Sequence, residues 1–258
     1  MLLEKKNAVI YGAGGGLGGG VARTFAREGG RVFLTGRHLA PLQALADDIR
    51  AAGGGAEVAE VDATDERAVE EHAAAVVADA GTIDVSFNLI SRGDVQGIPL
   101  VDMTAEQITG AAATALLSTF LTARAAARQM ISQGSGVILA VTSGTARVPA
   151  PMMGSTGPAD AAVESFLRCL AAEVGPQGVR VVGIHTAGVV ETLDPAKVLE
   201  VNPDTDVDRM VEMLAQMTLL KRAPRLAQIA ETAAFLASDH AGAITATTVN
   251  ASCGLVPG

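Results

Sequence analysis

The sequence predicts a single α/β domain built on a doubly wound parallel sheet. Three observations support this: short apolar segments alternate with amphipathic ones along all 258 residues, the apolar segments are nearly continuous, and a glycine-rich turn follows the first. Continuously apolar strands are typical of a parallel sheet covered by helices on both faces. Because crossover connections are right-handed, such a sheet is doubly wound and binds ligands at the carboxyl ends of its strands.

The stretch Asn7–Arg23 carries the strongest local signal. Residues 7–11 suit one buried strand, seven of residues 12–20 are glycine, and a helix follows until the glycines at 29–30. Glycine lets the backbone approach an anion closely, and a helix N-terminus supplies N–H groups and partial positive charge. A flexible linker is the alternative, but a strand before and a helix after the turn favour a dinucleotide phosphate site. The residues predicted to form it are Gly12, Gly14, Gly16, Leu17 and Gly18.

Six further strands are predicted in order along the chain. Each is a short apolar run rich in β-branched residues, and most are bounded by glycine, asparagine, aspartate or serine. They are expected at Arg31–Thr35, Glu57–Val61, Ile83–Asn88, Val137–Thr142, Val179–Ile184 and Thr247–Asn250.

Six further helices alternate with these strands, because apolar residues recur there at helical spacing. Thr64 and Asp65 cap one helix, and Thr104, followed by Glu106 and Gln107, caps the longest. The helices are expected at Leu39–Ala52, Asp65–Ala80, Thr104–Gln133, Asp160–Val174, Val207–Leu220 and Ala227–Ala237. Neither a repeat nor a linker divides the chain, so residues 1–258 are expected to form one domain.

Composition excludes several classes of function. The formal net charge is −9 without a basic tract, which disfavours nucleic-acid binding. Apolar runs stay shorter than the roughly 18 residues of a membrane span, so membrane insertion is not expected. Charged residues at positions 4–6 interrupt the region where a secretory signal would lie, which favours a cytoplasmic location. Cys169 and Cys253 lack a C-x-x-C partner or clustered histidines, so we predict no metal site.

Five motifs occur in a fixed order: YGAGGGLG from residue 11, DATD from residue 62, GTIDVSFNLIS from residue 81, GSGVILAVTSG from residue 134, and FLASDHAGAITATTVNASCG from residue 235. Over nearly its full length the chain therefore resembles the short-chain dehydrogenase/reductase family. The resemblance implies a Rossmann-type fold, oxidoreductase activity on a small-molecule substrate and a nicotinamide dinucleotide cofactor. It further implies cofactor contacts from Asp62, Ala63, Asn88, Asp160 and Gly188.

The same resemblance shows departures from the family pattern. Reducing members use a serine, a tyrosine about 13 residues later and a lysine four residues beyond it. Ser143 occupies the serine position, but Thr156 stands at the tyrosine position and Asp160 at the lysine position. Ala115 replaces the asparagine of the family's proton relay. Tyr11, the single tyrosine, already belongs to the glycine turn, where threonine is usual.

These departures bear on the chemistry. Carbonyl reduction needs an acid beside the developing alkoxide, and a threonine hydroxyl next to a carboxylate is a poor one. The proton must come from elsewhere, or the substrate needs little protonation. Ser143 either donates a hydrogen bond to the substrate or is simply a turn residue before a glycine. Asp160 either binds the ribose hydroxyls or is a charge at a helix N-terminus.

The histidines offer one further proton donor. His185 ends the strand at 179–184 near the expected cofactor, where it is either a donor or a structural residue. His72 and His240 are expected to be solvated helix-end residues. Asp94, after the Asn88 loop, could face the pocket.

Arg37 bears on the choice of cofactor. Members that bind NAD carry an acidic residue at the end of the second strand, where it takes the ribose 2′-hydroxyl. Here that position is Gly36 and Arg37 follows it, and an arginine there accommodates a 2′-phosphate. We therefore expect NADP(H) rather than NAD(H), the alternative being a solvated loop arginine.

The sequence thus predicts an NADP(H)-binding oxidoreductase with a non-standard active site that acts on a small, apolar substrate. A substrate lid is expected around residues 189–222, with methionines there that either wall the pocket or simply pack: Met210, Met213 and Met217. A non-redox isomerase, lyase or cyclase on the same scaffold, or a cofactor-binding protein without catalysis, remain alternatives.

By resemblance, a homodimer or homotetramer is also expected. The helices Thr104–Gln133 and Asp160–Val174 would form its interface, since small side chains permit close helix approach. The alanines predicted to do so are Ala111, Ala112, Ala115, Ala161 and Ala162.

Overall fold

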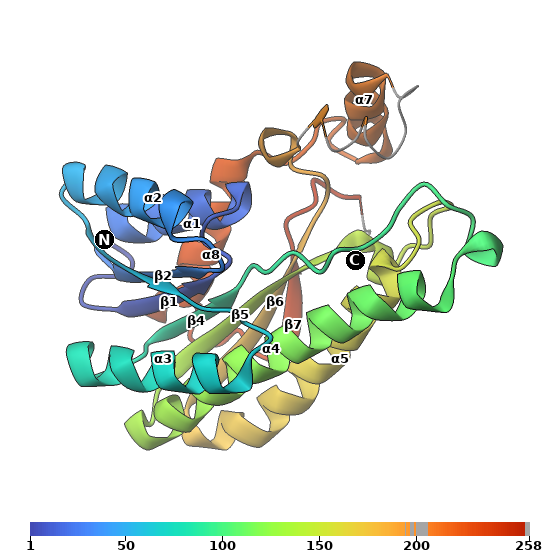
Figure 1. Ribbon diagram of the computed structural model, residues 1–258. Coiled ribbons are helices and arrows are strands. Elements are labelled where there is room, and N and C mark those ends of the chain that lie inside the picture. Colours follow the sequence, from blue (N-terminus) through green and yellow to red (C-terminus); the bar gives the residue numbers. More distant parts are fainter. Residues whose placement is uncertain (194, 197–198, 200–205, 256–258) are drawn as a thin grey trace.

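The computed structural model describes residues 1–193, 195–196, 199 and 206–255. Its core is a seven-stranded sheet in the order β3-β2-β1-β4-β5-β6-β7, and every strand pairs in parallel with its neighbours. Helices lie on both faces of this sheet (Figure 1). The predicted doubly wound α/β fold is therefore confirmed. The strands are β1 Asn7–Tyr11, β2 Arg31–Gly36, β3 Gly55–Glu60, β4 Val85–Asn88, β5 Gly136–Ser143, β6 Val179–Thr186 and β7 Thr247–Asn250.

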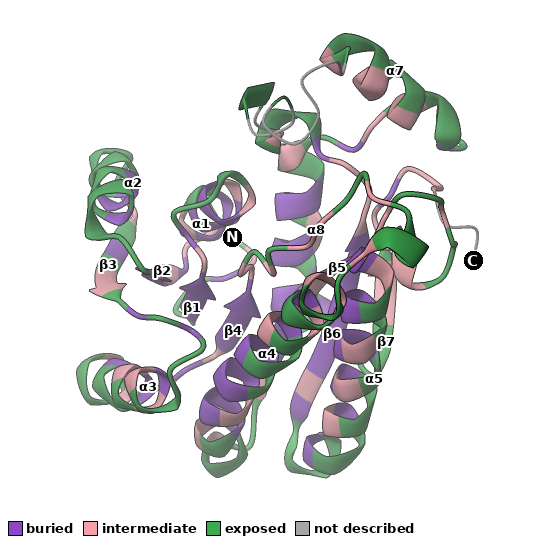
Figure 2. Ribbon diagram, turned by 45° about the vertical axis from the view of Figure 1, so that its right-hand side comes forward, coloured by how far each residue is buried: buried purple, intermediate pink, exposed green. Residues whose placement is uncertain are grey.

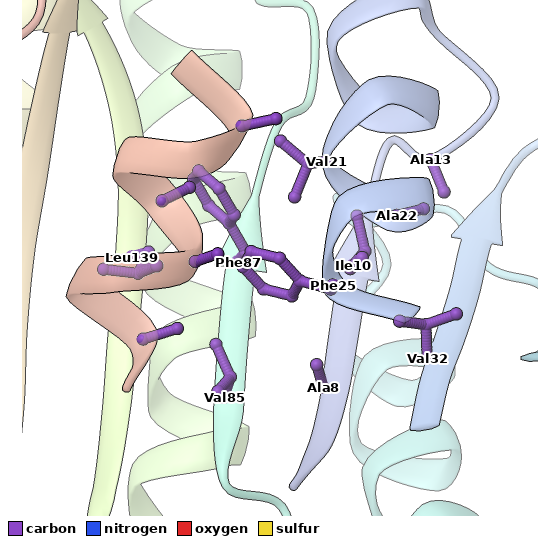
Figure 3. Packing of buried hydrophobic residues seen from close by; sticks show 14 of the residues in the cluster. Ala8, Ile10, Ala13, Val21, Ala22, Phe25, Val32, Val85, Phe87 and Leu139 are labelled. Carbon is purple, nitrogen blue, oxygen red and sulfur yellow. The ribbon is translucent and has the colours of Figure 1, made fainter. Parts of the chain in front are cut away.

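Two hydrophobic cores sandwich the sheet, because successive strand residues point to opposite faces. In β1, Ile10 belongs to the core beneath helices α1, α2 and α8, whereas Tyr11 belongs to the core beneath α3, α4 and α5. On the first side, the rings of Phe25 and Phe87 stack with centroids 6.3 Å apart (Figure 3). The helices are α1 Gly16–Arg27, α2 Leu39–Ala51, α3 Glu66–Ala80, α4 Ala105–Gln133, α5 Thr156–Val174, α7 Val207–Met217 and α8 Leu226–Ala237.

Two of the predicted capping residues, Asp65 and Thr104, begin α3 and α4 on one face of the sheet, whereas Thr64 does not cap a helix, because its hydroxyl donates to Asp62. The Asp65 carboxylate accepts the backbone N–H of Ala68 at 3.1 Å, at the start of α3. At the start of α4, Thr104 and Gln107 form a reciprocal capping box. Because these bonds satisfy N–H groups that lack intrahelical partners, they fix where α3 and α4 begin.

Helix α5 begins earlier than the sequence pattern predicts. It starts at Thr156 rather than Asp160, so the first turn contains Pro158. Proline is tolerated in a first turn, since its missing N–H would have no intrahelical acceptor there. This early start makes Thr156 and Asp160 neighbours on consecutive turns of one helix, with both side chains buried.

Two predictions about side-chain orientation are wrong. His72 is not a solvated helix-end residue: it lies within α3, is partly buried, and meets Tyr11 edge-on with ring centroids 6.2 Å apart. Ala111 and Ala115 do not form an outer interface, because they pack on the sheet with exposed fractions of 3% and 8%. Small side chains there let α4 lie close to the strands.

Helix α7 lies apart from the two helical layers, above the carboxyl edge of the sheet (Figures 1 and 2). None of its side chains is buried. Part of the predicted lid, including residues 200–205, falls outside the described residues. No helix in the described ranges has the length and apolar character that crossing a membrane requires.

Candidate functional site

The glycine turn follows β1 at the carboxyl edge of the sheet and leads into α1. Gly12 has φ +83°, and a Cβ added there would lie 2.6 Å from the carbonyl oxygen of Leu89. A Cβ on Gly18 would lie 2.3 Å from the carbonyl oxygen of Gly12. Both positions therefore require glycine to bring the start of α1 against the strand ends. The first-turn N–H groups of α1 lack intrahelical acceptors, as an anion-binding turn requires.

A cavity of about 380 Å³ opens beside this turn. Asp62 lines it, and its carboxylate accepts the backbone N–H and the hydroxyl of Thr64 at 2.9 and 2.7 Å. These two hydrogen bonds, with help from the charge of Arg37, lower the pKa of Asp62 below its usual range. We call this the larger cavity. Its lining includes Gly12, Gly14, Arg37, Asp62, Ala63 and Leu89.

Asn88 ends β4 and ties this strand to α4. Its side-chain nitrogen is within hydrogen-bond distance of three hydroxyls of α4, those of Ser118, Thr119 and Thr122, at 3.3 to 3.4 Å. Its carbonyl oxygen accepts the N–H of Ile90 at 2.9 Å. Asn88 thereby fixes the course of the chain that leaves β4.

A second cavity, of about 150 Å³, lies between α4 and α5. Leu89 and Ile90 line both cavities, so the two adjoin along the segment after β4. We call this one the smaller cavity. Its lining includes Leu17 from the glycine turn, Asn88, Arg92, Ala115, Ser118 and Asp160.

Asp160 connects α5 to the end of β5. Its Oδ2 atom accepts the backbone N–H of Ser143 at 2.7 Å and the Ser143 hydroxyl at 2.6 Å. Its Oδ1 atom forms an ion pair with Nη1 of Arg92 at 2.9 Å. The carboxylate at the lysine position is thus an acceptor of three contacts, and it is 1% exposed.

Thr156 lies under the chain segment that follows β4. Its hydroxyl donates to Oδ2 of Asp94 at 2.5 Å and accepts from Nε2 of Gln96 at 3.1 Å. Gln96 Nε2 also donates to Asp94 at 2.9 Å. Thr156 is 1% exposed, so these two side chains cover the position that tyrosine holds in the family pattern.

The two carboxylates differ in how readily they hold a proton. Burial raises the pKa of Asp160, and the nearby Asp94 adds to this effect, against the opposing influence of Arg92 and Ser143. Burial also acts to raise the pKa of Asp94, but Arg92, Thr156 and Gln96 outweigh it, so this pKa falls below its usual range. The pair is therefore electrostatically asymmetric, with Asp94 the stronger acid.

His185 lies on the α5 side of β6 and is 1% exposed. Its Nε2 atom contacts the carboxylate of Glu164, which also accepts the hydroxyl of Thr142 at 3.2 Å. Burial acts to raise the pKa of Glu164, but His185, Arg147 and Thr142 outweigh it and lower it. Neither cavity, as far as the described residues form it, is lined by His185. Its role as a proton donor stays a prediction.

Gly188 lies beyond β6, facing the helix α7. A Cβ added there would come within 3.2 Å of Leu214. Its predicted contact with cofactor stays a prediction. Among the described residues, His, Cys, Asp and Glu side chains form no group of three that could hold a metal ion.

Sequence patterns did not identify Arg92 and Gln96. Both lie in the segment after Asn88, where the family motif is not preserved, and both contact residues at least 60 positions away in the chain. No local pattern signals these contacts, because they join the segment after β4 to α5 across the fold.

Comparisons with known proteins agree with this fold. A family model described as Enoyl-(Acyl carrier protein) reductase matches residues 12–256. The chain is 31% identical to L-rhamnose 1-dehydrogenase (NAD(P)(+)) of Azotobacter vinelandii, with 99% of this chain and 98% of that protein covered. It is 28% identical to 7alpha-hydroxysteroid dehydrogenase of Escherichia coli, with 98% and 94% covered.

Solved structures give the same result. A short-chain type dehydrogenase/reductase from Mycobacterium marinum superposes with a TM-score of 0.85 at 27% identity, covering 99% of this chain and 97% of that one. An actinorhodin polyketide ketoreductase with NADPH superposes with a TM-score of 0.88 at 24% identity, covering 97% of each chain.

A parallel sheet with a glycine turn at its carboxyl edge defines a Rossmann-type α/β protein. More specifically, the chain belongs to the short-chain dehydrogenase/reductase family, whose members use nicotinamide cofactors.

Proposed function

We propose that this protein is an NADP(H)-binding oxidoreductase whose active site departs from the family pattern. The observation that carries the proposal is the larger cavity, which the glycine turn, Arg37 and Asp62 line together. A Cβ at Gly12 or Gly18 would collide with a carbonyl oxygen of this chain, so glycine keeps the turn tight. A tight turn that leads into a helix N-terminus fits a dinucleotide phosphate. The dinucleotide would supply a hydride, and this chain's residues would bind and orient it.

The choice of NADP(H) rests on Arg37. Arg37 is exposed and lines the larger cavity. Gly36 stands where members that bind NAD carry the carboxylate that accepts a hydrogen bond from the ribose 2′-hydroxyl. An arginine in this place recognises a 2′-phosphate through charge-assisted hydrogen bonds. The NADPH named with the ketoreductase structure and the NAD(P)(+) named for the rhamnose dehydrogenase are consistent with this proposal.

The site's hydroxyl protons argue against ordinary ketone reduction. Thr156 donates its proton to Asp94, and Ser143 donates to Asp160. Each hydroxyl has one proton, so neither is available to a developing alkoxide. We therefore propose that the substrate is an electrophile that accepts hydride with little protonation, such as an iminium ion or an activated alkene.

The substrate is proposed to be small and apolar. Helix α7 lies above the carboxyl edge of the sheet and exposes Met213 and Met217, with exposed fractions of 59% and 54%. Flexible apolar side chains of this kind adapt to an apolar partner. In this proposal the lid around residues 189–222 closes over the substrate.

A second candidate is favoured by the loss of the tyrosine and lysine. Thr156 is covered and Asp160 is ion-paired, which also fits a non-redox isomerase, lyase or cyclase, or a protein that binds cofactor without catalysis. In either case cofactor binding can be measured independently of hydride transfer, because the glycine turn that would bind the cofactor does not include residues of α5.

The phosphate site can be tested with Gly16→Asp. The atoms nearest a Cβ at Gly16 belong to Thr192, whose side chain lies at 3.2 Å and can shift, so the fold should survive, while the new charge opposes phosphate at the helix N-terminus. NADPH titration should show at least a hundredfold weaker binding. Gly110→Asp, on an open surface of α4, is the matched control. Unchanged NADPH affinity in folded Gly16→Asp would refute the phosphate site.

A further inference from the structure

We propose that Arg92 supplies the cation that the family pattern places on α5, and that it binds the ribose hydroxyls of the nicotinamide half of the cofactor. This inference rests on the proposed function. It assigns a role to a residue of the segment between β4 and α4, whereas the expected lysine position is taken by an acid.

The position of Arg92 supports this assignment. Its side chain lines the smaller cavity together with Leu17 of the glycine turn and Asn88. It is 20% exposed, and its Nη1 atom lies 2.9 Å from Oδ1 of Asp160. The positive charge is therefore held beside the residue at the lysine position, on the wall of a cavity that adjoins the larger one.

The guanidinium has donors to spare. Arginine carries five N–H donors in a planar arrangement. Nε lies 3.4 Å from Oδ1 of Asp94, yet it is buried without a hydrogen-bond partner among the described residues. Because Nε is buried, the ligand hydroxyls would accept from the Nη donors, of which the Asp160 contact takes one.

Asp160 is a poor candidate for the same task. Its Oδ2 atom already accepts two hydrogen bonds from Ser143, and its Oδ1 atom faces Arg92. Asp160 is almost fully buried, so its carboxylate holds Arg92 and the end of β5 in place. The two residues thus form a reversed arrangement: an acid on α5 orients a cation delivered by the loop.

The test must avoid leaving an unpaired buried charge, which would disturb the fold. The double variant Arg92→Met with Asp160→Asn removes both charges of the Arg92–Asp160 pair together, and Asp94 keeps the hydrogen bonds from Thr156 and Gln96. Binding of NADPH and of 2′,5′-ADP is measured by isothermal titration calorimetry. The second ligand lacks the nicotinamide half and needs only the residues of the larger cavity, such as Arg37, so it reports whether the fold and that half of the site persist.

The expected result is specific to one half of the cofactor. NADPH should bind at least tenfold more weakly to the double variant, the size of one charge-assisted hydrogen bond, while 2′,5′-ADP affinity stays within twofold. Arg92→Met with Asp160→Lys returns a cation to α5 and should recover most of the lost NADPH affinity. The neutralised surface pair Arg128→Met with Glu70→Gln, whose native atoms lie 2.8 Å apart, is the matched control.

Three outcomes would overturn the inference, and they distinguish its failure from that of the proposed function. NADPH binding unchanged in Arg92→Met with Asp160→Asn, or no recovery in Arg92→Met with Asp160→Lys while 2′,5′-ADP still binds, would remove Arg92 from the site and leave the proposed function standing. If the native protein binds neither NADPH nor 2′,5′-ADP, the proposed function and the inference fall together.

Discussion

The Asp160 carboxylate accepts both the backbone N–H and the hydroxyl of Ser143, at 2.7 and 2.6 Å. This pair joins the first turns of α5 to the end of β5, at the edge where the cavities lie. It also turns the serine proton toward a buried acid. One relationship therefore stabilises the site and removes its expected proton donor.

Ser143→Ala should lower the free energy of unfolding by about 1.5–3 kcal/mol, the usual contribution of a hydrogen bond to a charged group. The hydroxyl bonds to Asp160 and to Thr145 are lost, while the backbone bond to Asp160 remains. Urea unfolding measures the change. Ser165→Ala, at an exposed position of α5, should change stability by less than about 0.5 kcal/mol. Equal effects of the two variants would contradict this account.

NADPH should bind at least tenfold tighter than NADH, because Arg37 follows a glycine at the end of β2. Arg37→Ala should abolish most of this preference without changing NADH affinity, since the arginine contacts only the 2′-phosphate in this proposal. Fluorescence titration with both cofactors checks it. Arg67→Ala, on the exposed face of α3, serves as the control. A preference that survives Arg37→Ala would refute the assignment.

Stability should fall as the pH drops from about 6.5 to 4, in part because of His72. Burial lowers the pKa of His72 from 6.5 to about 4. In this pH range His72 is protonated in the unfolded chain but neutral in the folded chain, so a lower pH favours unfolding. The free energy of unfolding should fall by at most about 3 kcal/mol. His72→Gln should therefore flatten this part of the stability profile. His240→Gln, at an exposed position, should leave the stability profile unchanged. Identical profiles for the native protein and His72→Gln would contradict this role of His72.

Association is proposed through the outer faces of α4 and α5. Leu117 and Phe120 of α4 are 43% and 38% exposed, and Phe120 meets Phe166 of α5 edge-on at 5.9 Å between centroids. Light scattering should give a dimer or tetramer mass, and Phe120→Glu should reduce it. Leu220→Glu, after α7, is the control for an exposed apolar residue. A monomer mass for the native protein at micromolar concentration would contradict the proposal.

The fold was predictable because its signals are local. The strand–turn–helix at Asn7–Arg23 combines apolar runs and glycines within a short stretch, and the structure has β1 and α1 there. Thr156 and Asp160 were located by their spacing from Ser143 in the family pattern, although the helix was predicted to begin only at Asp160 and in fact includes both. Local patterns set elements and register, and these determine which residues reach the carboxyl edge.

The contacts within the site were not predictable in the same way. Arg92 pairs with Asp160, and Gln96 with Thr156, across at least 60 positions of sequence. Such pairs depend on how the segment after β4 folds over α5, which hydrophobic periodicity does not encode. His72 was mispredicted for a related reason: its polar ring packs on Tyr11 within an otherwise amphipathic helix.

The central claim is that cofactor binding persists while ordinary carbonyl reduction is lost. The measurement that tests it most directly is NADPH oxidation by the native protein against matched ketone, iminium and activated-alkene substrates. Because the active site lacks the family's tyrosine and lysine, ketone reduction loses general-acid catalysis, which typically raises the rate 10²–10⁴-fold. The double variant Thr156→Tyr with Asp160→Lys, which restores the family pattern, provides the comparison.

The account predicts turnover of iminium or activated-alkene substrates by the native protein and negligible turnover of plain ketones. Ketone turnover should rise in Thr156→Tyr with Asp160→Lys, provided this variant still binds NADPH. Robust reduction of plain ketones by the native protein would contradict the account, since another acid, with His185 the first candidate, would then have replaced the tyrosine.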